Sequence, residues 1–320
     1  MITPVYNGEA FIRRCMESVL AQTYRNWDYT IVDNRSTDRT LEIAREFALR
    51  DLRIRVVTNE HFVPVNQNYN NGFRRISPES KYCKVIAADD WLFAECLEKM
   101  VSFAEEHPSV AIVGAYALAD SRVMWQGLPL ASSFVTGRDL CRAWLLGGPY
   151  VFGTASSELF RSDIVRSRHA FYNESNLHAD SEACLEFLRD ADFGFVHQVL
   201  VFHGTQQNSL TSFSQRMNTY LPYWLYELVE YGPDYLDSNE LAARIREVLA
   251  SYYSYLGEQA YERRERAFWD YHRDKLAEVG YPLNTVRLAA AATSYSLNKL
   301  NATSLVRALA RPLRKLFTRS

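Results

Sequence analysis

The chain has 320 residues, of which 48% are hydrophobic and 23% charged, and its formal net charge is −2 at pH 7. These values are ordinary for a globular protein, and a net charge this small excludes a general electrostatic attraction to nucleic acid. No apolar run reaches the roughly 18–20 residues that span a bilayer, and the five cysteines form no Cys-x-x-Cys pair, which argues against a zinc site. We therefore expect a cytoplasmic protein.

The first ninety residues alternate between strand and helix patterns. This alternation predicts an α/β fold, with a mostly parallel sheet that has helices on both faces. In such sheets, ligands bind beyond the carboxyl ends of the strands. The expected strands are residues 1–6, 28–33, 54–59 and 82–90, and the expected helices are residues 9–22, 39–50 and 66–76.

The second half of the chain changes character. A helix is expected over 92–107, strands over 110–119 and 193–204, and a helix over 178–191, with a Gly- and Ser-containing stretch at 126–157. From about residue 214 onward, the patterns are almost entirely helical. We therefore predict a first domain over residues 1–213 and a helical C-terminal region over 214–320.

Acidic residues stand at two predicted strand ends. Asp33 ends one strand, and Asp89 and Asp90 end another. One of the paired aspartates could cap the helix that follows. Two adjacent carboxylates repel each other, however, unless a positive charge lies beside them, and a divalent cation is a natural candidate. Because both strand ends are expected at one edge of the sheet, we favour a metal site there.

Six segments, taken in order, carry a resemblance to a known family. They are "TPVYNGEAFIRRCMESVLAQTY", "IVDNRSTDRT", "NQNYNNGF", "AADDWL", "HADSEACLEFL" and "VHQVLVFHGTQQNSLTS". This ordered set resembles the family 2 glycosyltransferases, which have the GT-A fold, and it covers about two-thirds of the chain. The resemblance implies an inverting enzyme that moves a sugar from a nucleotide-sugar donor, with UDP as the expected nucleotide, to an acceptor hydroxyl in cell-surface polysaccharide or glycolipid assembly.

The resemblance also implies roles for individual residues on the donor side. It places Thr3, Pro4 and Tyr6 around the base, although Tyr6 could instead pack in the core. Glu9 would reach the nucleotide, although it could instead complement the dipole of its own helix. Asp33 would accept a hydrogen bond from the base or the ribose, which suits a carboxylate.

The paired aspartates and a later acid complete the implied site. Asp90 is the expected ligand of Mn²⁺ or Mg²⁺, and Asp89 would contact the ribose or support the ion. Asp180 is the expected general base for the acceptor hydroxyl, with helix capping as its alternative and Glu182 as the other candidate base. His178 is interpreted as structural or as an acceptor contact rather than as the base.

This sequence departs from the family pattern at several positions. A second aspartate and a glycine of the family are Asn34 and Arg35 here, and Ala87 and Ala179 stand where acids are common. Gln206 stands where the family commonly has a histidine near the last motif, and His203 lies three residues away. Only two residues precede Thr3, so we expect the first strand to begin upstream of Met1.

The last residues form a basic amphipathic pattern. Leucines recur along one stripe of residues 304–320, among five positive charges, and Pro312 would kink such a helix. A helix of this kind can bind an anionic membrane surface, which would suit a lipid-linked acceptor, or it can dock on the protein's own core. The leucines of the stripe are Leu305, Leu309, Leu313 and Leu316.

Two other functions remain open from the sequence. A nucleotidyltransferase would be expected to carry a basic, Gly-rich phosphate loop after its first strand, and "PVYNGEAF" has no lysine or arginine. A non-catalytic relative that binds nucleotide sugars or glycans is suggested by the departures at Asn34, Ala87, Ala179 and Gln206. Release of UDP with and without Mn²⁺ would separate these functions.

Overall fold

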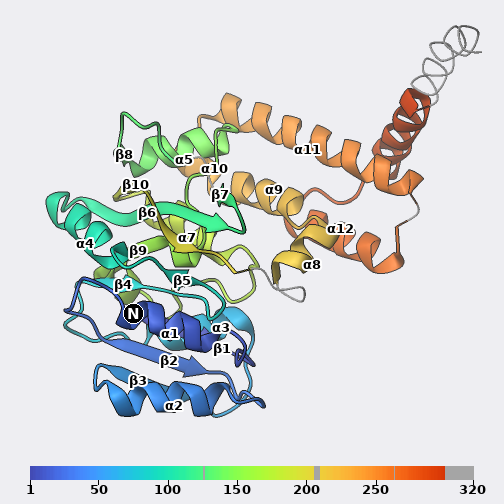
Figure 1. Cartoon of the computed structure of the whole chain (residues 1–320). Helices are drawn as coiled ribbons and strands as arrows, with labels where there is room; N and C mark the ends of the chain where they lie inside the picture. The colour runs from blue at the N-terminus through green and yellow to red at the C-terminus, as the bar shows by residue number, and fades with distance from the viewer. Residues whose placement is uncertain (125–126, 205–209, 263, 300–320) are drawn as a thin grey trace, which may run out of the picture. The chain divides into compact units, whose positions relative to one another are not determined.

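The structure, a computed structural model, describes residues 1–124, 127–204, 210–262 and 264–299. It divides into two compact units, Met1–Ser212 and Phe213–Ser320 (Figure 1). Gln206 and the basic segment 304–320, which the sequence singled out, lie outside the described residues.

The first unit begins with a three-stranded parallel sheet in the order β1-β2-β3. Its strands β1 (Ile2–Val5), β2 (Tyr29–Asp33) and β3 (Ile54–Thr58) alternate with α1 (Ile12–Leu20), α2 (Thr40–Arg50) and α3 (Val65–Phe73). Val5 pairs with Asp33 at the carboxyl ends of β1 and β2. A parallel bridge from Ile2 to Val85 continues the pairing beyond β1. The alternation expected from the sequence is confirmed here.

A second, seven-stranded sheet completes this unit, in the order β4-β9-β6-β10-β5, with β7 on β6 and β8 on β10. The long strands β6 and β10 are parallel to each other, and the other pairs of this sheet are antiparallel. The strands are β4 (Tyr82–Lys84), β5 (Trp91–Leu92), β6 (Val110–Ala119), β7 (Arg122–Met124), β8 (Phe134–Thr136), β9 (Glu158–Arg161) and β10 (Asp192–Phe202).

Shorter elements connect these strands. Among them, α4 and α7 match predicted helices, whereas α5, η1, β9 and α6 were not predicted. The elements are α4 (Cys96–Glu106), α5 (Gly137–Leu145), η1 (Ala155–Ser157), α6 (Ser162–Arg166) and α7 (Ala179–Phe187).

The strand predicted over residues 82–90 is wrong in its second half. Only Tyr82–Lys84 pair as β4, Val85 adds the bridge to β1, and the chain then turns, with the Asp90 N–H donating to the Ala87 carbonyl at 3.0 Å. The apolar letters after Val85 are typical of a buried strand, but the Ala87 N–H donates to the Ser156 hydroxyl at 2.9 Å instead of to a ladder partner. The paired aspartates therefore sit on a turn.

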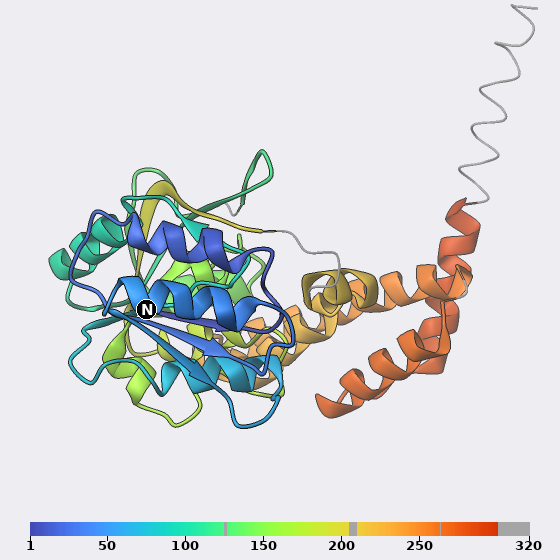
Figure 2. The same cartoon turned by 60° about the horizontal axis from the view of Figure 1, so that its bottom comes forward.

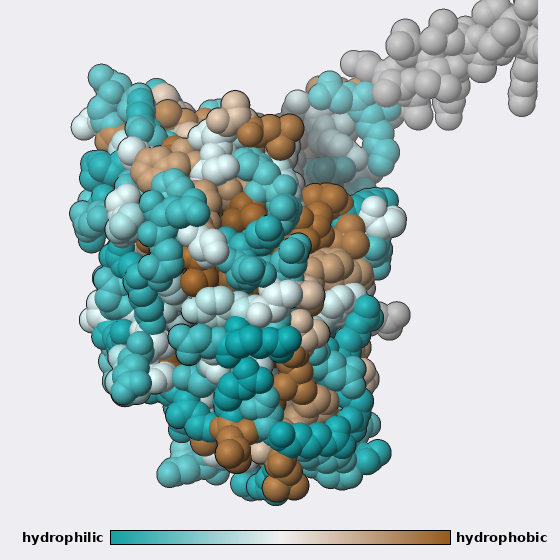
Figure 3. Space-filling view, turned by 60° about the vertical axis from the view of Figure 1, so that its left-hand side comes forward, coloured by the Kyte–Doolittle hydropathy of each residue, from teal (hydrophilic) through white to brown (hydrophobic). Residues whose placement is uncertain are grey.

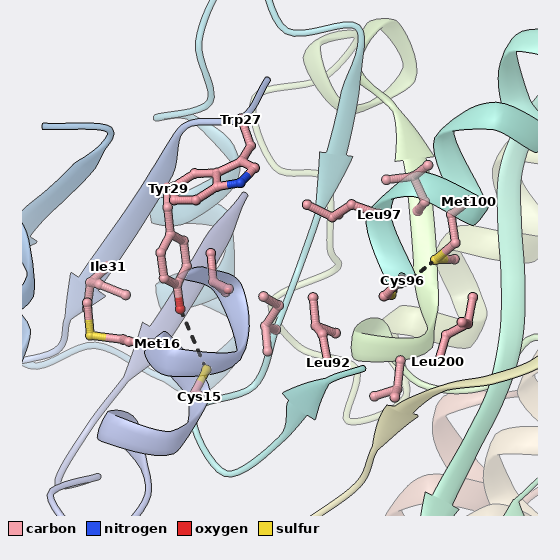
Figure 4. Packing of buried hydrophobic residues seen from close by; sticks show 14 of the residues in the cluster. Cys15, Met16, Trp27, Tyr29, Ile31, Leu92, Cys96, Leu97, Met100 and Leu200 are labelled. Atoms are coloured by element: carbon pink, nitrogen blue, oxygen red, sulfur yellow. Dashed lines mark hydrogen bonds between the residues drawn. The ribbon is translucent and has the colours of Figure 1, made fainter. Parts of the chain in front are cut away.

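The main hydrophobic cluster joins the two sheets (Figure 4). Tyr29 on β2 is fully buried, and its hydroxyl lies 2.7 Å from the Thr3 hydroxyl and 3.6 Å from the Cys15 sulfur. On the other side of the cluster, Leu92 and Leu200 come from β5 and β10. This packing fixes the strands whose ends carry the acidic residues.

The second unit consists of helices in its described residues (Figures 1 and 2). Residues 238–280, within the region that the sequence predicts to be helical, form two helices, α11 and α12, and residues 285–299 form a further helix. The other helices are α8 (Leu210–Met217), α9 (Tyr220–Glu230), α10 (Gly232–Tyr235), α11 (Ser238–Tyr261) and α12 (Arg266–Glu278).

Hydrophobic residues on the surface shown in Figure 3 form small patches among hydrophilic ones. Such scattered exposure is normal for a folded protein. Across the part of the chain that the structure describes, no helix combines the length and the apolar character needed to cross a bilayer.

His272 connects three helices of the second unit. It is fully buried on α12, its Nε2 lies 2.9 Å from the Met217 carbonyl on α8, and its Nδ1 lies 2.5 Å from the Tyr252 hydroxyl on α11. A neutral imidazole satisfies both contacts, because it donates through one nitrogen and accepts through the other. Burial lowers the pKa of His272 from 6.5 to about 4.

We expect the second unit to lose stability as the pH falls from about 6.5 towards 4. Between these pH values His272 is protonated in the unfolded chain but neutral in the folded unit. This difference in pKa lowers the free energy of unfolding by up to about 3 kcal/mol. Above pH 6.5 this contribution is fully present. Thermal melts at several pH values would measure it, with His272→Gln as the control that should remove the dependence. An equal acid slope in parent and variant would contradict the assignment.

Candidate functional site

Asp33 lies where β2 ends. Its side chain is 1% exposed, and one carboxylate oxygen accepts the Ser36 N–H at 3.2 Å. The second oxygen, Oδ2, is buried and has no hydrogen-bond partner among the described residues. A buried polar atom without a partner is costly, so such an atom at a strand end indicates a place for a ligand.

Asp90, on the turn after Val85, is likewise buried with one carboxylate oxygen that has no hydrogen-bond partner among the described residues. It is 1% exposed, its Oδ1 accepts the Gly204 N–H at 2.8 Å, and its Oδ2 is buried without a partner among the described residues. Helix α4 begins at Cys96, well after the aspartates, and no side chain caps it. The alternative that one of these aspartates caps the next helix is therefore wrong.

His203 belongs to this site, although the sequence assigned it no role. It directly follows β10, and its Nδ1 lies 3.1 Å from Asp90 Oδ1. The Asp90 carboxylate raises the pKa of His203 above its ordinary value, because the imidazolium is stabilised by the adjacent negative charge. In the sequence, the indication of this role is only that a histidine directly follows a predicted strand. The structure is needed to show that this strand brings His203 next to Asp90.

Asp180 lies in the first turn of α7. Its Oδ1 accepts the N–H of Ser181 at 2.9 Å, and the Ala155 N–H also contacts the carboxylate. Burial raises the pKa of Asp180 above its ordinary value. A raised pKa makes a carboxylate a stronger base at neutral pH, which suits proton abstraction.

The segment after residue 153 brings Asp180 and the aspartate turn into one site. Ala155 contacts Asp180, and the next residue, Ser156, accepts the Ala87 N–H at 2.9 Å. Tyr69 on α3 lies close to all three aspartates. Burial, and then the charges of Asp90, Asp89 and Asp180, raise the pKa of its hydroxyl. The three carboxylates thus lie within electrostatic reach of one phenol.

The remaining expected donor residues have different surroundings. Thr3 and Pro4 are buried within β1, and the Thr3 hydroxyl faces Tyr29 in the core. Tyr6 is 48% exposed rather than packed in the core, and its ring meets Phe62 edge-on at 4.8 Å. The roles of these three residues towards a nucleotide stay predictions.

Glu9 has a partner at the start of another helix. Its carboxylate accepts the N–H of Arg39 at 2.9 Å, just before α2 begins, and its own N–H donates to Asp38 at 3.1 Å. The carboxylate therefore complements the positive end of α2, not that of its own helix α1. A nucleotide contact by Glu9 stays a prediction.

Asn34, where the family has an acid, has a structural position. Its side-chain oxygen accepts from Asn59 at 2.9 Å and from the Val63 N–H at 3.0 Å, and its amide donates to the Val63 carbonyl at 2.8 Å. Both polar atoms of its side chain therefore have partners within the chain. Asn34, which replaces an acid of the family, therefore does not bond the partnerless Oδ2 of Asp33.

Asp90 is the residue on this side whose chemistry fits a divalent cation. Among the described residues, no cluster of three or more His, Cys, Asp or Glu side chains is arranged to hold a metal ion. Mg²⁺ bound with nucleotides, however, usually takes one or two carboxylates and completes its shell with phosphates and water. The orphaned Oδ2 of Asp90, a hard and buried oxygen, fits this mode of binding.

Gly204 sets the shape of the aspartate turn. A Cβ atom at this position would lie 2.3 Å from the Asp89 carbonyl oxygen, which is part of the backbone and cannot rotate away. We expect Gly204→Ala to displace the turn and to lower the affinity for UDP with Mn²⁺ by at least about tenfold, because misplacement by about 1 Å can cost a hundredfold. Calorimetric titration would measure the affinity.

The matched control is Gly232→Ala in the second unit, where the added Cβ would meet the flexible end of Leu241 at 2.5 Å. This variant should keep the parental affinity for UDP. Unchanged affinity in Gly204→Ala would mean that the turn tolerates the clash.

Comparison with known proteins identifies a matching family model and a similar glycosyltransferase. The family model for Glycosyl transferase family 2 matches residues 1–156. Glycosyltransferase GlyA of Streptococcus pneumoniae is 32% identical over 116 residues, which are 36% of this chain and 16% of that protein. The chain thus aligns with about one-sixth of the length of this relative.

Two solved structures share the fold. Staphylococcus aureus TarS 1-349 in complex with UDP-GlcNAc has a TM-score of 0.64 and 16% identity, over 87% of this chain and 79% of that chain. Mannosyltransferase PcManGT from Pyrobaculum calidifontis, in complex with GDP-Man and Mn²⁺, has a TM-score of 0.58 and 15% identity, over 99% and 82%. These likenesses confirm the expected GT-A fold with a helical C-terminal region.

Proposed function

Because this chain belongs to glycosyl transferase family 2, we propose that it transfers a sugar from a UDP-linked donor to an acceptor hydroxyl, with inversion at the anomeric carbon. The acceptor is a glycan or a lipid-linked glycan in the assembly of a cell-surface polysaccharide or glycolipid. Two similar structures contain nucleotide sugars, UDP-GlcNAc in TarS and GDP-Man in PcManGT, which supports a donor of this class.

The proposal rests on two buried carboxylate oxygens that lack a hydrogen-bond partner among the described residues, Oδ2 of Asp33 and Oδ2 of Asp90. Each belongs to a side chain that is 1% exposed, and each lacks a partner among the described residues. They lie beyond β2 and beyond the bridge from β1 to Val85, on the carboxyl side of parallel pairing. A nucleotide diphosphate with its cation would satisfy both.

Each acidic residue then has a separate task. Asp33 accepts a hydrogen bond from the base or the ribose, and Asp89 contacts the ribose or supports the cation. Asp90, with His203 beside it, would hold Mn²⁺ or Mg²⁺, and the cation would supply positive charge to the departing diphosphate. PcManGT, which contains Mn²⁺, supports this cofactor class.

Asp180 takes the proton of the acceptor hydroxyl. It shares the site with the aspartate turn through the contacts of Ala155 and Ser156. A base on the side of the anomeric carbon opposite to the diphosphate directs attack from that side, and a single displacement inverts the centre. The raised pKa of Asp180 supports this role.

A panel of nucleotide sugars tests the proposal. Each donor is added to the full chain with Mn²⁺ or with a chelator, and both the melting temperature and nucleotide release are followed. We expect one UDP-sugar to stabilise the protein and to release UDP faster with Mn²⁺ and an acceptor glycan. Stabilisation without any release would favour a non-catalytic binding protein, and no response to any donor would contradict the proposal.

A further inference from the structure

Glu182, the other candidate base, has both carboxylate oxygens in use. It lies in the first turn of α7 and is 4% exposed. The side-chain amide of Asn173 donates to one oxygen at 3.1 Å, and that of Asn176 donates to the other at 2.7 Å. A buried carboxylate that accepts two amide hydrogens is poorly placed to take a proton from a substrate hydroxyl.

The loop that carries these asparagines is also held from its other side. Asn66 on α3 donates to the backbone carbonyls of Asn173, at 3.2 Å, and Asn176, at 2.5 Å. One turn further along α3, Asn70 exchanges two hydrogen bonds with the backbone of Tyr172, at 2.8 and 2.9 Å. The loop 172–176 therefore lies between α3 and α7, with polar contacts on both sides.

This loop leads directly into the helix that carries the proposed base. The Asn176 oxygen accepts the His178 N–H at 3.0 Å, and the His178 carbonyl accepts the Glu182 N–H at 3.0 Å. Asp180 lies between these two bonded residues. Any shift of the loop would move the first turn of α7 and the Asp180 carboxylate with it.

We propose that Glu182 is a positioning residue, which holds Asp180 in place by binding the amides of Asn173 and Asn176. This inference rests on the proposed function, since it assumes that Asp180 takes the acceptor proton. The contacts of α3 extend the arrangement towards the donor side: Asn68 bonds Asn59 at 2.8 Å, and Asn59 bonds Asn34 next to Asp33 at 2.9 Å. Glu182 thus links the position of the base to the donor half of the site.

Glu182→Gln tests the proposal first. Glutamine offers one oxygen and one NH₂ group to two amide donors, so one of the two contacts becomes repulsive. We expect kcat to fall by about tenfold to a hundredfold, because misplacement of a catalytic group by about 1 Å has effects of this size. The KM for the donor should change by less than about threefold, and a measurable rate should remain.

Exchanging the two groups gives the decisive result. Asn176→Asp alone would place two carboxylates together and should also lower kcat. The double variant Glu182→Gln/Asn176→Asp restores one amide facing one carboxylate, with Asn173 still donating to the glutamine oxygen. We expect its kcat to recover to within about threefold of the parent. A glutamine cannot act as a base, so recovery would exclude Glu182 from proton transfer.

Three outcomes would overturn the proposal. A parental kcat in Glu182→Gln would show that the contacts do not position Asp180. Loss of more than a thousandfold without recovery in the double variant would identify Glu182 as the base. If Glu182→Gln does not fold, Asn176→Ala replaces it, and a parental kcat in that variant would overturn the proposal as well. A parent protein that transfers no sugar would instead disprove the proposed function.

Discussion

Replacing Asp180 by asparagine is expected to lower sugar transfer by about 10²–10⁴-fold, which is the usual contribution of a general base. Asparagine keeps the size of the side chain and an oxygen that can accept the Ser181 N–H, so the first turn of α7 should stay intact. It has no basic oxygen for the proton of the acceptor hydroxyl. Initial rates with saturating donor and acceptor would measure the loss.

Donor binding should survive in the same variant. The orphaned oxygens proposed to meet the nucleotide and its cation belong to Asp33 and Asp90, and neither is bonded to Asp180. The affinity for UDP with Mn²⁺ should therefore match that of the parent. The fall in rate should also be accompanied by loss of the acid limb of the pH–rate profile, because the group that titrates there has been removed.

Asp163→Asn provides a matched control for Asp180→Asn. Asp163 is also an aspartate in the first turn of a helix, α6, but it is exposed and paired with Arg161 at 2.7 Å. This control should leave the rate unchanged. A near-parental rate in a folded, UDP-binding Asp180→Asn protein would reduce Asp180 to a helix-terminal residue.

The sequence was most informative where short-range patterns decide the structure. In α1, buried residues such as Ile12, Met16 and Val19 recur at helical spacing, and the pairing of β1 with β2 follows from the connection through that helix. The alternation also placed Asp33 at the end of its strand. These features depend on neighbours within one supersecondary unit, and the expected α/β fold is confirmed.

The sequence was less informative where distant segments compete for a backbone group. The apolar run after Val85 is typical of a strand, yet the Ala87 N–H finds the Ser156 hydroxyl and the chain turns. Glu182 looks like a spare acid beside Asp180, and only the fold brings Asn173 and Asn176 onto its two oxygens. No periodicity encodes such contacts, because each depends on how a loop returns to the sheet.

Removing the charge of Asp90 is expected to abolish the effect of Mn²⁺ on UDP binding. Asp90→Asn keeps an oxygen that can accept the Gly204 N–H, so the turn should hold its shape. The buried Oδ2 loses its negative charge, and a neutral amide is a weak ligand for a hard cation. Asp90→Ala also removes the Gly204 contact and should give the same loss of metal dependence.

Thermal melts with UDP, in the presence of Mn²⁺ or of a chelator, would measure this effect. In the parent, Mn²⁺ should enlarge the shift in melting temperature caused by UDP, since a ligand stabilises a protein in proportion to the logarithm of its concentration over its Kd. In Asp90→Asn, the shifts with Mn²⁺ and with chelator should be equal, while the melting temperature without ligand stays near that of the parent. Asp163→Asn should behave like the parent. If Mn²⁺ enlarges the shift in Asp90→Asn as much as in the parent, the cation is held by other groups, and the assignment of Asp90 as its ligand fails.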